Sequence, residues 1–189
     1  MPRPRSDDKR AAIMSAATRI VAAQGLGAAT AAIAKEAGVS NGSLFTYFDT
    51  KADLFNHLYL ELKSDMGAAA LGGLPDGAGP REQLLHMWTG WLRWAITQPD
   101  KRRALAQLQV SDEITTATHE TASRAMAGVA VIMERGRENG PLKDAPLAFV
   151  ITLANALAEA TIDYALKDPE NAETHGRSGF DALWRIFGG

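Results

Sequence analysis

The residue types that could do chemistry in this 189-residue chain gather between residues 40 and 51. A short helix over about 41–48 would turn Leu44 and Phe48 inward. It would turn outward a set of small hydroxyls, one amide and two aromatic rings: Asn41, Gly42, Ser43, Phe45, Thr46 and Tyr47. Such a face is unusual for solvent. Its hydroxyl and amide groups suit hydrogen bonding to base edges and phosphates.

Two helices and a tight turn would hold that face in place. Thr30 can cap a first helix over about 30–37. Its apolar positions repeat at helical spacing along one face: Ile33, Ala34 and Ala37. Gly38 can end this helix in the left-handed conformation, Val39 anchors the turn, and Ser40 can begin the next helix. This spacing predicts a helix-turn-helix, which places its second helix in the DNA major groove. The alternative is an ordinary helical hairpin with a solvated face.

The segment AKEAGVSNGSLFTYFDTKADLF, residues 34–55, resembles the tetracycline-repressor (TetR) family of bacterial transcriptional regulators. The motifs that resemble the family cover about residues 8–66, and the rest agrees in length and helical character. By this resemblance Thr30, Tyr47 and Lys51 contact phosphates, with Lys51 near a helix N-terminus that also favours an anion. The resemblance also implies a groove-facing set, and Ser40 just before it completes the predicted DNA-binding residues. The groove-facing set is Asn41, Gly42, Ser43, Phe45 and Thr46.

These groove-facing residues have defined chemistry. Asn41 can pair with adenine through two hydrogen bonds, hydroxyls can bond to several bases, and Phe45 can cover a thymine methyl group. The chain departs from the family at two places. Phe45 stands where tyrosine is more frequent, and Ala31 and Ala32 stand where relatives often carry a polar or basic residue. We therefore expect base recognition to depend on fewer polar groups than usual.

Charge divides unevenly along the chain. The net charge is −2, but residues 1–51 hold seven Lys or Arg against four Asp or Glu, a balance of +3. The remaining 138 residues hold 13 basic and 18 acidic side chains, a balance of −5. Positive charge thus accompanies the motif, as binding to a phosphate backbone requires. The basic leader Pro-Arg-Pro-Arg could lie along DNA or serve as a solubilising tail.

Other function classes find little support. The chain has no cysteine, which excludes disulfides, thiolate metal sites and cysteine nucleophiles. No phosphate loop, dinucleotide fingerprint or nucleophile elbow is present, and His57, His86, His119 and His175 show no paired spacing. A metal site from His86, His119 and Asp163 is conceivable, but nothing in the spacing requires it. We expect no enzyme activity, no cofactor and no metal. Without a signal peptide or a membrane-length apolar run, we expect a cytoplasmic protein.

Helical periodicity continues throughout, so we predict an all-α protein. An amphipathic helix over 8–24 completes a three-helix DNA-binding domain, residues 1–52, and a connecting helix spans 53–66. A Gly-, Ala- and Pro-rich linker, 67–80, leads to a helical effector-binding and dimerisation domain, 81–189. Its helices are expected at about 81–98, 101–110, 113–138, 145–167 and 173–187.

The last two of these helices predict a subunit interface. Small residues would let another helix approach, and the final helix carries a bulky apolar stripe at the end of the chain. The predicted interface residues are Ala154, Leu157, Ile162, Phe180, Leu183, Trp184 and Phe187. A two-fold four-helix bundle from these helix pairs is the arrangement that the family resemblance implies. The alternative is that the stripe packs within one subunit.

A predicted effector pocket centres on the tryptophan-rich helix over 81–98. Indole rings three residues apart, with a histidine and a methionine, could line a cavity for an apolar or planar molecule, and polar groups could anchor it. The pocket set is His86, Met87, Trp88, Trp91, Trp94, His119, Asn155 and Glu159. Alternatively the rings are plain core, and the polar stripe of Asn155, Glu159 and Asp163 faces water. The sequence thus favours a homodimeric repressor released from a pseudo-palindromic operator by a small molecule. A DNA-binding regulator that is effector-independent or controlled by a protein partner is the alternative.

Overall fold

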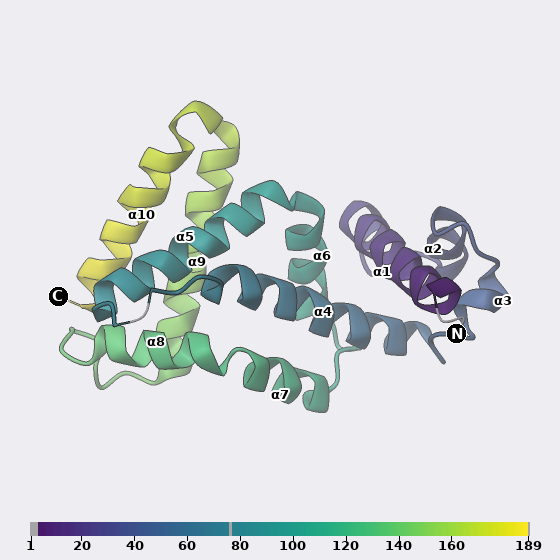
Figure 1. Ribbon diagram of the computed structural model, residues 1–189, viewed down its shortest axis with the longest axis horizontal. Coiled ribbons are helices and arrows are strands. Elements are labelled where there is room, and N and C mark those ends of the chain that lie inside the picture. The colour runs from purple at the N-terminus through teal and green to yellow at the C-terminus, as the bar shows by residue number, and fades with distance from the viewer. Residues whose placement is uncertain (1–3, 76, 189) are drawn as a thin grey trace. The chain divides into compact units, whose positions relative to one another are not determined.

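The computed structural model describes residues 4–75 and 77–188, and every regular element within these ranges is a helix (Figure 1). This confirms the predicted all-α class. The elements are α1 (Pro4–Gln24), α2 (Thr30–Glu36), α3 (Asn41–Leu44), α4 (Lys51–Leu71), α5 (Pro80–Thr97), α6 (Pro99–Gln109), α7 (Thr116–Ala125), α8 (Ala127–Arg137), α9 (Leu147–Lys167), the 3-10 helix η1 (Pro169–Asn171) and α10 (Ala172–Phe187).

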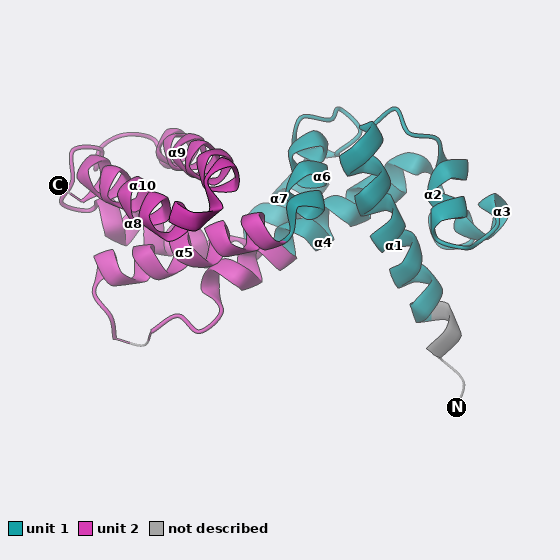
Figure 2. Cartoon of the chain, turned by 90° about the horizontal axis from the view of Figure 1, so that it is seen from above, with its two compact units in different colours: residues 1–64, 98–124 teal, residues 65–97, 125–189 magenta. Residues whose placement is uncertain are grey.

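The helices group into two compact units (Figure 2). Unit 1 comprises residues 1–64 and 98–124, and unit 2 comprises residues 65–97 and 125–189. The sequence-based division differs from this one, because it assigned residues 98–124 to the C-terminal domain. In the structure α6 packs against α1. The chain therefore passes between the units three times, within α4, between α5 and α6, and at the end of α7.

Unit 1 is built on the apolar stripe of α1. Ile13, Ala16, Ala17 and Val21 on this stripe are buried, whereas Ile20 keeps part of its surface. The helix ends at Gly25, whose φ of +75° is a left-handed conformation that costs glycine nothing. The apolar residues along one face of α4 are buried as well: Leu54, Phe55, Leu58, Tyr59 and Leu62.

In unit 2, α5 packs against α8, α9 and α10, and α9 packs along α10. By length and composition α9 could span a membrane, but core helices of soluble proteins pass the same test. Five of its residues are buried in unit 2: Val150, Ala154, Ala158, Ile162 and Ala165. The apolar character of α9 is therefore at least partly that of a core helix.

Two boundaries differ from the prediction. α4 continues through residues 67–71, which we expected to begin the linker. Gly67 is not a helix break there. It gives room to a neighbour, because a Cβ atom at this position would lie 2.7 Å from Met126 Sδ. The single helix expected over 113–138 is divided at the same Met126, whose φ of −93° and ψ of 9° leave the helical region.

One arginine organises the irregular segment between α8 and α9. Arg137 is only 7% exposed. Its Nη1 donates to the carbonyls of Leu142, Lys143 and Ala145 at 2.8, 3.0 and 2.6 Å. Its Nε and Nη2 donate to the two carboxylate oxygens of Glu134 at 2.7 and 2.8 Å, and this hydrogen bonding lowers the pKa of Glu134. A single side chain thus holds three carbonyls of this loop and one carboxylate of α8.

Candidate nucleic-acid interface

The turn between α2 and α3 has the predicted geometry. Gly38 has a φ of +69°, its N–H donates to Lys35 O at 3.1 Å, and the Val39 N–H donates to Ala34 O at 3.0 Å. This pair of bonds is a Schellman motif, which satisfies the last carbonyls of a helix. The start of α2 differs by one residue. Ala29, with an extended backbone and no capping side chain, is the N-cap, so Thr30 is the first helical residue and does not cap the helix.

Ser40 caps α3 as predicted, because its Oγ accepts the Ser43 N–H at 3.1 Å. Leu44 and Phe48 are buried, which confirms the inward face. The helix itself is shorter than the expected 41–48 and ends at Leu44. Beyond it, backbone N–H groups bond three residues back, from Thr46 to Ser43 O at 3.1 Å and from Tyr47 to Leu44 O at 3.0 Å. The chain tightens into a 3-10-like turn here.

The outward face remains available to a ligand. Asn41, Gly42, Phe45 and Thr46 are exposed, Phe45 by 39%, and Ser43 and Tyr47 are partly exposed. Among the residues that the structure describes, neither the Asn41 amide nor the Tyr47 hydroxyl has a hydrogen-bond partner. The Thr46 hydroxyl donates to Ser43 O at 2.7 Å, so it can offer a ligand only its lone pairs.

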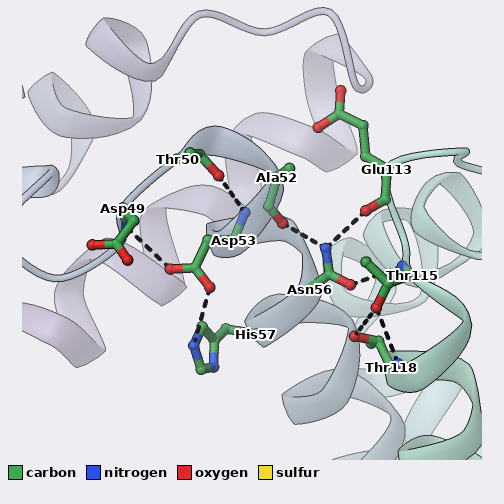
Figure 3. Close-up of polar contacts among 9 residues, drawn as sticks. All are labelled: Asp49, Thr50, Ala52, Asp53, Asn56, His57, Glu113, Thr115 and Thr118. Atoms are coloured by element: carbon green, nitrogen blue, oxygen red, sulfur yellow. Dashed lines mark hydrogen bonds and ion pairs between the residues drawn. The ribbon is translucent and has the colours of Figure 1, made fainter.

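Lys51 is held in a defined position at the start of α4. Its Nζ donates to Leu26 O at 2.6 Å and lies 5.2 Å from the centre of the Phe55 ring. One of the three ammonium hydrogens is thus used within the protein, and two remain for a phosphate. The helix N-terminus beside it is partly satisfied already. The Asp53 N–H donates to Thr50 Oγ1 at 3.0 Å, and Asp53 Oδ2 accepts the Asp49 N–H at 3.1 Å (Figure 3).

Arg10 is a candidate that the sequence did not single out. Its guanidinium lies 5.4 Å from the centre of the Phe48 ring, in a cation–π arrangement beside the recognition helix. In the sequence it contributed only to the charge balance, since nothing local indicates this tertiary contact. Arg19 is less available to DNA, because its Nε pairs with Glu36 Oε1 at 2.9 Å.

A side-chain amide fastens α4 to the segment between α6 and α7, within unit 1 (Figure 3). Asn56 Nδ2 donates to Ala52 O at 2.7 Å and to Glu113 O at 2.8 Å, while Asn56 Oδ1 accepts the Thr115 N–H at 3.0 Å. Thr115 Oγ1 in turn accepts the Thr118 N–H at 3.2 Å, which caps α7. Sequence reasoning missed Asn56 because its partners lie 57 and 59 residues away.

The predicted effector-pocket residues do not form one group. His119 belongs to unit 1, where its ring meets the edge of Tyr59, while the others belong to unit 2. Met87 and Trp94 are buried, and Trp94 Nε1 donates to Asp65 Oδ2 at 3.1 Å. Trp88 alone of the predicted set lines the cavity of about 480 Å³ between α5 and α10. Of the three indole rings, Trp88 and Trp94 are buried and Trp91 is partly exposed, so two of the three agree with the alternative that the rings are core.

The remaining pocket residues lie as follows. Trp91 is partly exposed and meets Trp88 edge-on at a centroid distance of 6.4 Å, and a His86 ring nitrogen lies 2.8 Å from Gly72 O. Asn155 and Glu159 keep part of their surface. In the part of the chain that the structure describes, no three histidine or acidic residues are grouped to hold a metal ion.

Most of the predicted interface residues are covered within the subunit. Phe180, Leu183 and Phe187 are at most 1% exposed, and Ala154 and Ile162 are also buried. They pack in unit 2 because α9 and α10 turn these faces toward each other and toward α5. Of the predicted set, Leu157 and Trp184 keep part of their surface.

Comparison with known proteins agrees with this geometry. Residues 13–58 match the model of the bacterial regulatory proteins of the tetR family. A TetR family transcription regulator from Marinobacter aquaeolei VT8 has a TM-score of 0.88 at 24% identity, with 98% of each chain covered. A putative tetR family transcription regulator from Shewanella sp. PV-4 has a TM-score of 0.82 at 25% identity, with 93% of this chain and 96% of that chain covered. The mycobacterial regulator LfrR from Mycobacterium smegmatis, solved with proflavine, has a TM-score of 0.69 at 18% identity and covers 93% of this chain and 95% of that chain.

An all-helical chain with an exposed, Ser-capped recognition helix behind a glycine turn is a helix-turn-helix DNA-binding transcriptional regulator. Residues 13–58 match the tetR family of bacterial regulatory proteins, and the fold of nearly the whole chain resembles that of solved TetR family transcription regulators.

Proposed function

We propose that this regulator is a cytoplasmic homodimeric repressor that binds a pseudo-palindromic operator and is released from it by a small molecule. The observation that carries the DNA-binding part is the exposed face of α3 and the following turn, on which the Asn41 amide has no hydrogen-bond partner among the described residues. Two such heads would enter successive major grooves, about 34–36 Å apart. Regulators of this family are transcription factors, so no catalytic step is proposed.

The contacts assign a different chemistry to each residue of the face. Asn41 can donate to and accept from adenine, and Phe45 can pack on a thymine methyl group. Thr46 can act only as an acceptor, which pairs it with the amino group of adenine or cytosine. Phosphates would be held by Tyr47 and Lys51, and by three further groups that stand beside the recognition helix: Thr30, Ser40 and Arg10.

The proposed dimer uses the face of α9 that unit 2 leaves uncovered. Phe149 and Tyr164 are 51% and 58% exposed and share one helical face with three more residues that retain surface: Leu153, Ala156 and Ala160. The two alanines let a second helix approach closely, and the larger side chains supply apolar area. Leu157, the next partly exposed residue of α9, flanks this face. A second copy of the chain is the partner that a two-fold arrangement requires.

The effector part of the proposal is supported by the cavity in unit 2. A fully packed body would instead favour the effector-independent alternative. LfrR, a structural relative, has been solved with a bound small molecule. A ligand that binds the DNA-incompetent state more tightly by about 1–3 kcal/mol would give typical coupling. The three chain passages between the units and the Asn56 contacts are the routes by which such a shift could reach α4.

The experiment that tests the DNA-binding proposal is selection of bound sequences from a randomised DNA pool by the purified full chain at near-physiological salt. We expect an enriched inverted repeat. Asn41→Ala should relax base preference at one position of each half-site, whereas Tyr47→Phe should weaken binding to all sequences alike. Lack of enrichment by a folded protein, or equal losses of Asn41→Ala on specific and random DNA, would contradict the assignment.

Lys51 needs a charge-neutral replacement that retains a donor for Leu26 O, so Lys51→Gln is preferable to Lys51→Ala. If Lys51 contacts one phosphate in each head, the slope of log K against log salt should fall by about 1 per head. Lys143→Gln is the matched control, because Lys143 is an exposed lysine of unit 2. An equal slope for both variants would remove Lys51 from the interface.

A further inference from the structure

The cavity between α5 and α10 has a mostly apolar wall. Its lining includes Leu85, Trp88, Leu92, Ile96, Ala172 and Gly176, and the polar Thr89 and Thr97 also line it. The Trp88 indole N–H donates to Gly176 O at 2.9 Å. The Thr97 hydroxyl donates to Arg93 O at 2.7 Å. Neither of these donors remains for a ligand, and the Thr89 hydroxyl is the other side-chain donor of the wall, so the wall offers mainly contact area to the body of a bound molecule.

Charge is confined to the edge of the cavity. Arg93 and Arg177 line it from α5 and α10, and Glu173 is the only acid beside them. Arg177 is engaged by Glu173, with Nη2 3.1 Å from Oε1. Arg93 makes no ion pair among the residues that the structure describes. An unpaired guanidinium next to an apolar wall is suited to a carboxylate, which it can bind through two parallel hydrogen bonds.

The size of the cavity fits a small molecule. Its volume of about 480 Å³ lies within the usual range for ligand sites, about 300–1,000 Å³. Gly176 lines it, and a Cβ atom at this position would already be in van der Waals contact with Leu92 Cδ2, at 3.4 Å. A larger side chain at residue 176 would therefore project against the wall.

The geometry points to an amphipathic carboxylate as the effector, with its hydrocarbon part along Leu92, Ile96 and Trp88 and its carboxylate on Arg93. This inference rests on the proposed function, since it names the ligand class for the effector of that regulator. It replaces the apolar or planar effector that the tryptophan pattern predicted, because Trp91 and Trp94 do not line this cavity.

The test is direct titration of the purified full chain, without DNA, with decanoate, decanol and decyltrimethylammonium, followed by calorimetry and tryptophan fluorescence. We expect decanoate to bind at least about tenfold more tightly than decanol, and the cation not to bind. One charge-assisted hydrogen bond supplies about that factor. Equal binding of decanoate and decanol, or tighter binding of the cation, would overturn the inference.

Three variants place the site. Arg93→Gln should weaken decanoate about tenfold and leave decanol unchanged, and Gly176→Val should weaken both. Arg185→Gln is the matched control, because Arg185 is an exposed arginine of α10 that does not line the cavity. Decanoate binding that Arg93→Gln and Gly176→Val leave intact would refute the assignment. Far-UV circular dichroism checks that each variant is folded.

Two further measurements separate this inference from the proposed function. If decanoate binds in the Arg93-dependent way but does not release a selected operator, the ligand site stands and the effector-release proposal fails. If an operator is enriched but decanoate does not bind, the DNA-binding proposal stands and this inference fails. Size-exclusion chromatography should show the same oligomer with and without decanoate. Decanoate that binds only a dissociated monomer would show that a second copy covers the cavity, which would overturn the inference.

Discussion

Replacing Asn56 by leucine should loosen the segment between α6 and α7 from α4. Leucine has a similar size and shape but can neither donate nor accept a hydrogen bond. The Ala52 carbonyl, which accepts from Asn56 in the wild-type protein, remains in the α4 helical ladder. Glu113 O and the Thr115 N–H lose the hydrogen bonds that join them to the Asn56 side chain of α4. At about 0.5–1.5 kcal/mol for each bond, the loss is about 1–3 kcal/mol of local stability. Because both groups can be hydrated in this exposed segment, the lower part of the range is expected.

Amide hydrogen exchange at Thr115 measures this loss directly. Local opening that is easier by about 1–3 kcal/mol speeds exchange by about fivefold to about 150-fold. The Val39 amide, which donates to Ala34 O in the helix-turn-helix, is an internal control that should not change. Equal Thr115 exchange in the wild-type protein and Asn56→Leu would refute the role assigned to Asn56.

Asn56→Asp adds a pH-dependent arm to the same experiment. An aspartate keeps the acceptor for the Thr115 N–H but faces Glu113 O and Ala52 O with a carboxylate oxygen instead of a donor. Protonation at low pH can restore one donor. Thr115 in this variant should therefore be less protected relative to the wild-type protein at pH 7 than at about pH 4. Protection at pH 7 equal to that of the wild-type protein would show that the two donated bonds contribute nothing.

Further outcomes concern the turn, a cap, the α8–α9 segment and the α9–α10 turn. Gly38→Ala should lower the free energy of unfolding by about 1–2 kcal/mol because of its φ of +69°, whereas Gly42→Ala, with open space around its Cβ position, should not destabilise in a urea titration. Ser40→Ala should cost about 1 kcal/mol, and no change in the urea midpoint would show that the cap is replaced by water. Arg137→Met should destabilise more than Arg177→Met, whose ion pair with Glu173 is exposed, and the reverse order would contradict the role of Arg137 in the loop. Hydrogen bonds from His175 and Asn171 lower the pKa of Asp168 below its ordinary value of 3.8. The ionised Asp168 carboxylate therefore stabilises the fold above pH 3.8, and this stabilisation is lost as the pH falls below that value. Asp168→Asn should therefore lose less stability than the wild-type protein over that acid range, and identical acid transitions would refute this.

The helix-turn-helix could be predicted closely because its determinants are local. A glycine with positive φ, a serine cap three residues before the N–H it accepts, and apolar residues four apart are all visible within ten positions. The helices of the body were equally predictable from periodicity, to within a few residues at most ends. The division at Met126 was not, because the residue leaves the helical region inside an otherwise regular pattern.

What covers each apolar face could not be predicted from the same pattern. The stripe of Phe180, Leu183 and Phe187 would look alike whether a partner subunit or α5 and α9 buried it. The roles of the tryptophans could not be predicted for a similar reason. The N–H of Trp88 donates to a residue 88 positions away, and that of Trp94 donates to a residue 29 positions away. Those partners decide which ring faces a cavity and which is core.

The tether between Lys51 and Leu26 O bears on the conformational entropy of DNA recognition. A lysine side chain that goes from free rotation to one rotamer loses up to about 1.5–2 kcal/mol of rotamer entropy. In Lys51 much of that loss occurs when the protein folds, because the ammonium is already held on a carbonyl and beside the Phe55 ring. Lys35 is exposed and makes no such bond among the described residues, so it would lose its freedom only on meeting DNA. Two lysines that release the same number of counterions would thus contribute unequally to affinity, with the larger share from the one that folding has already ordered.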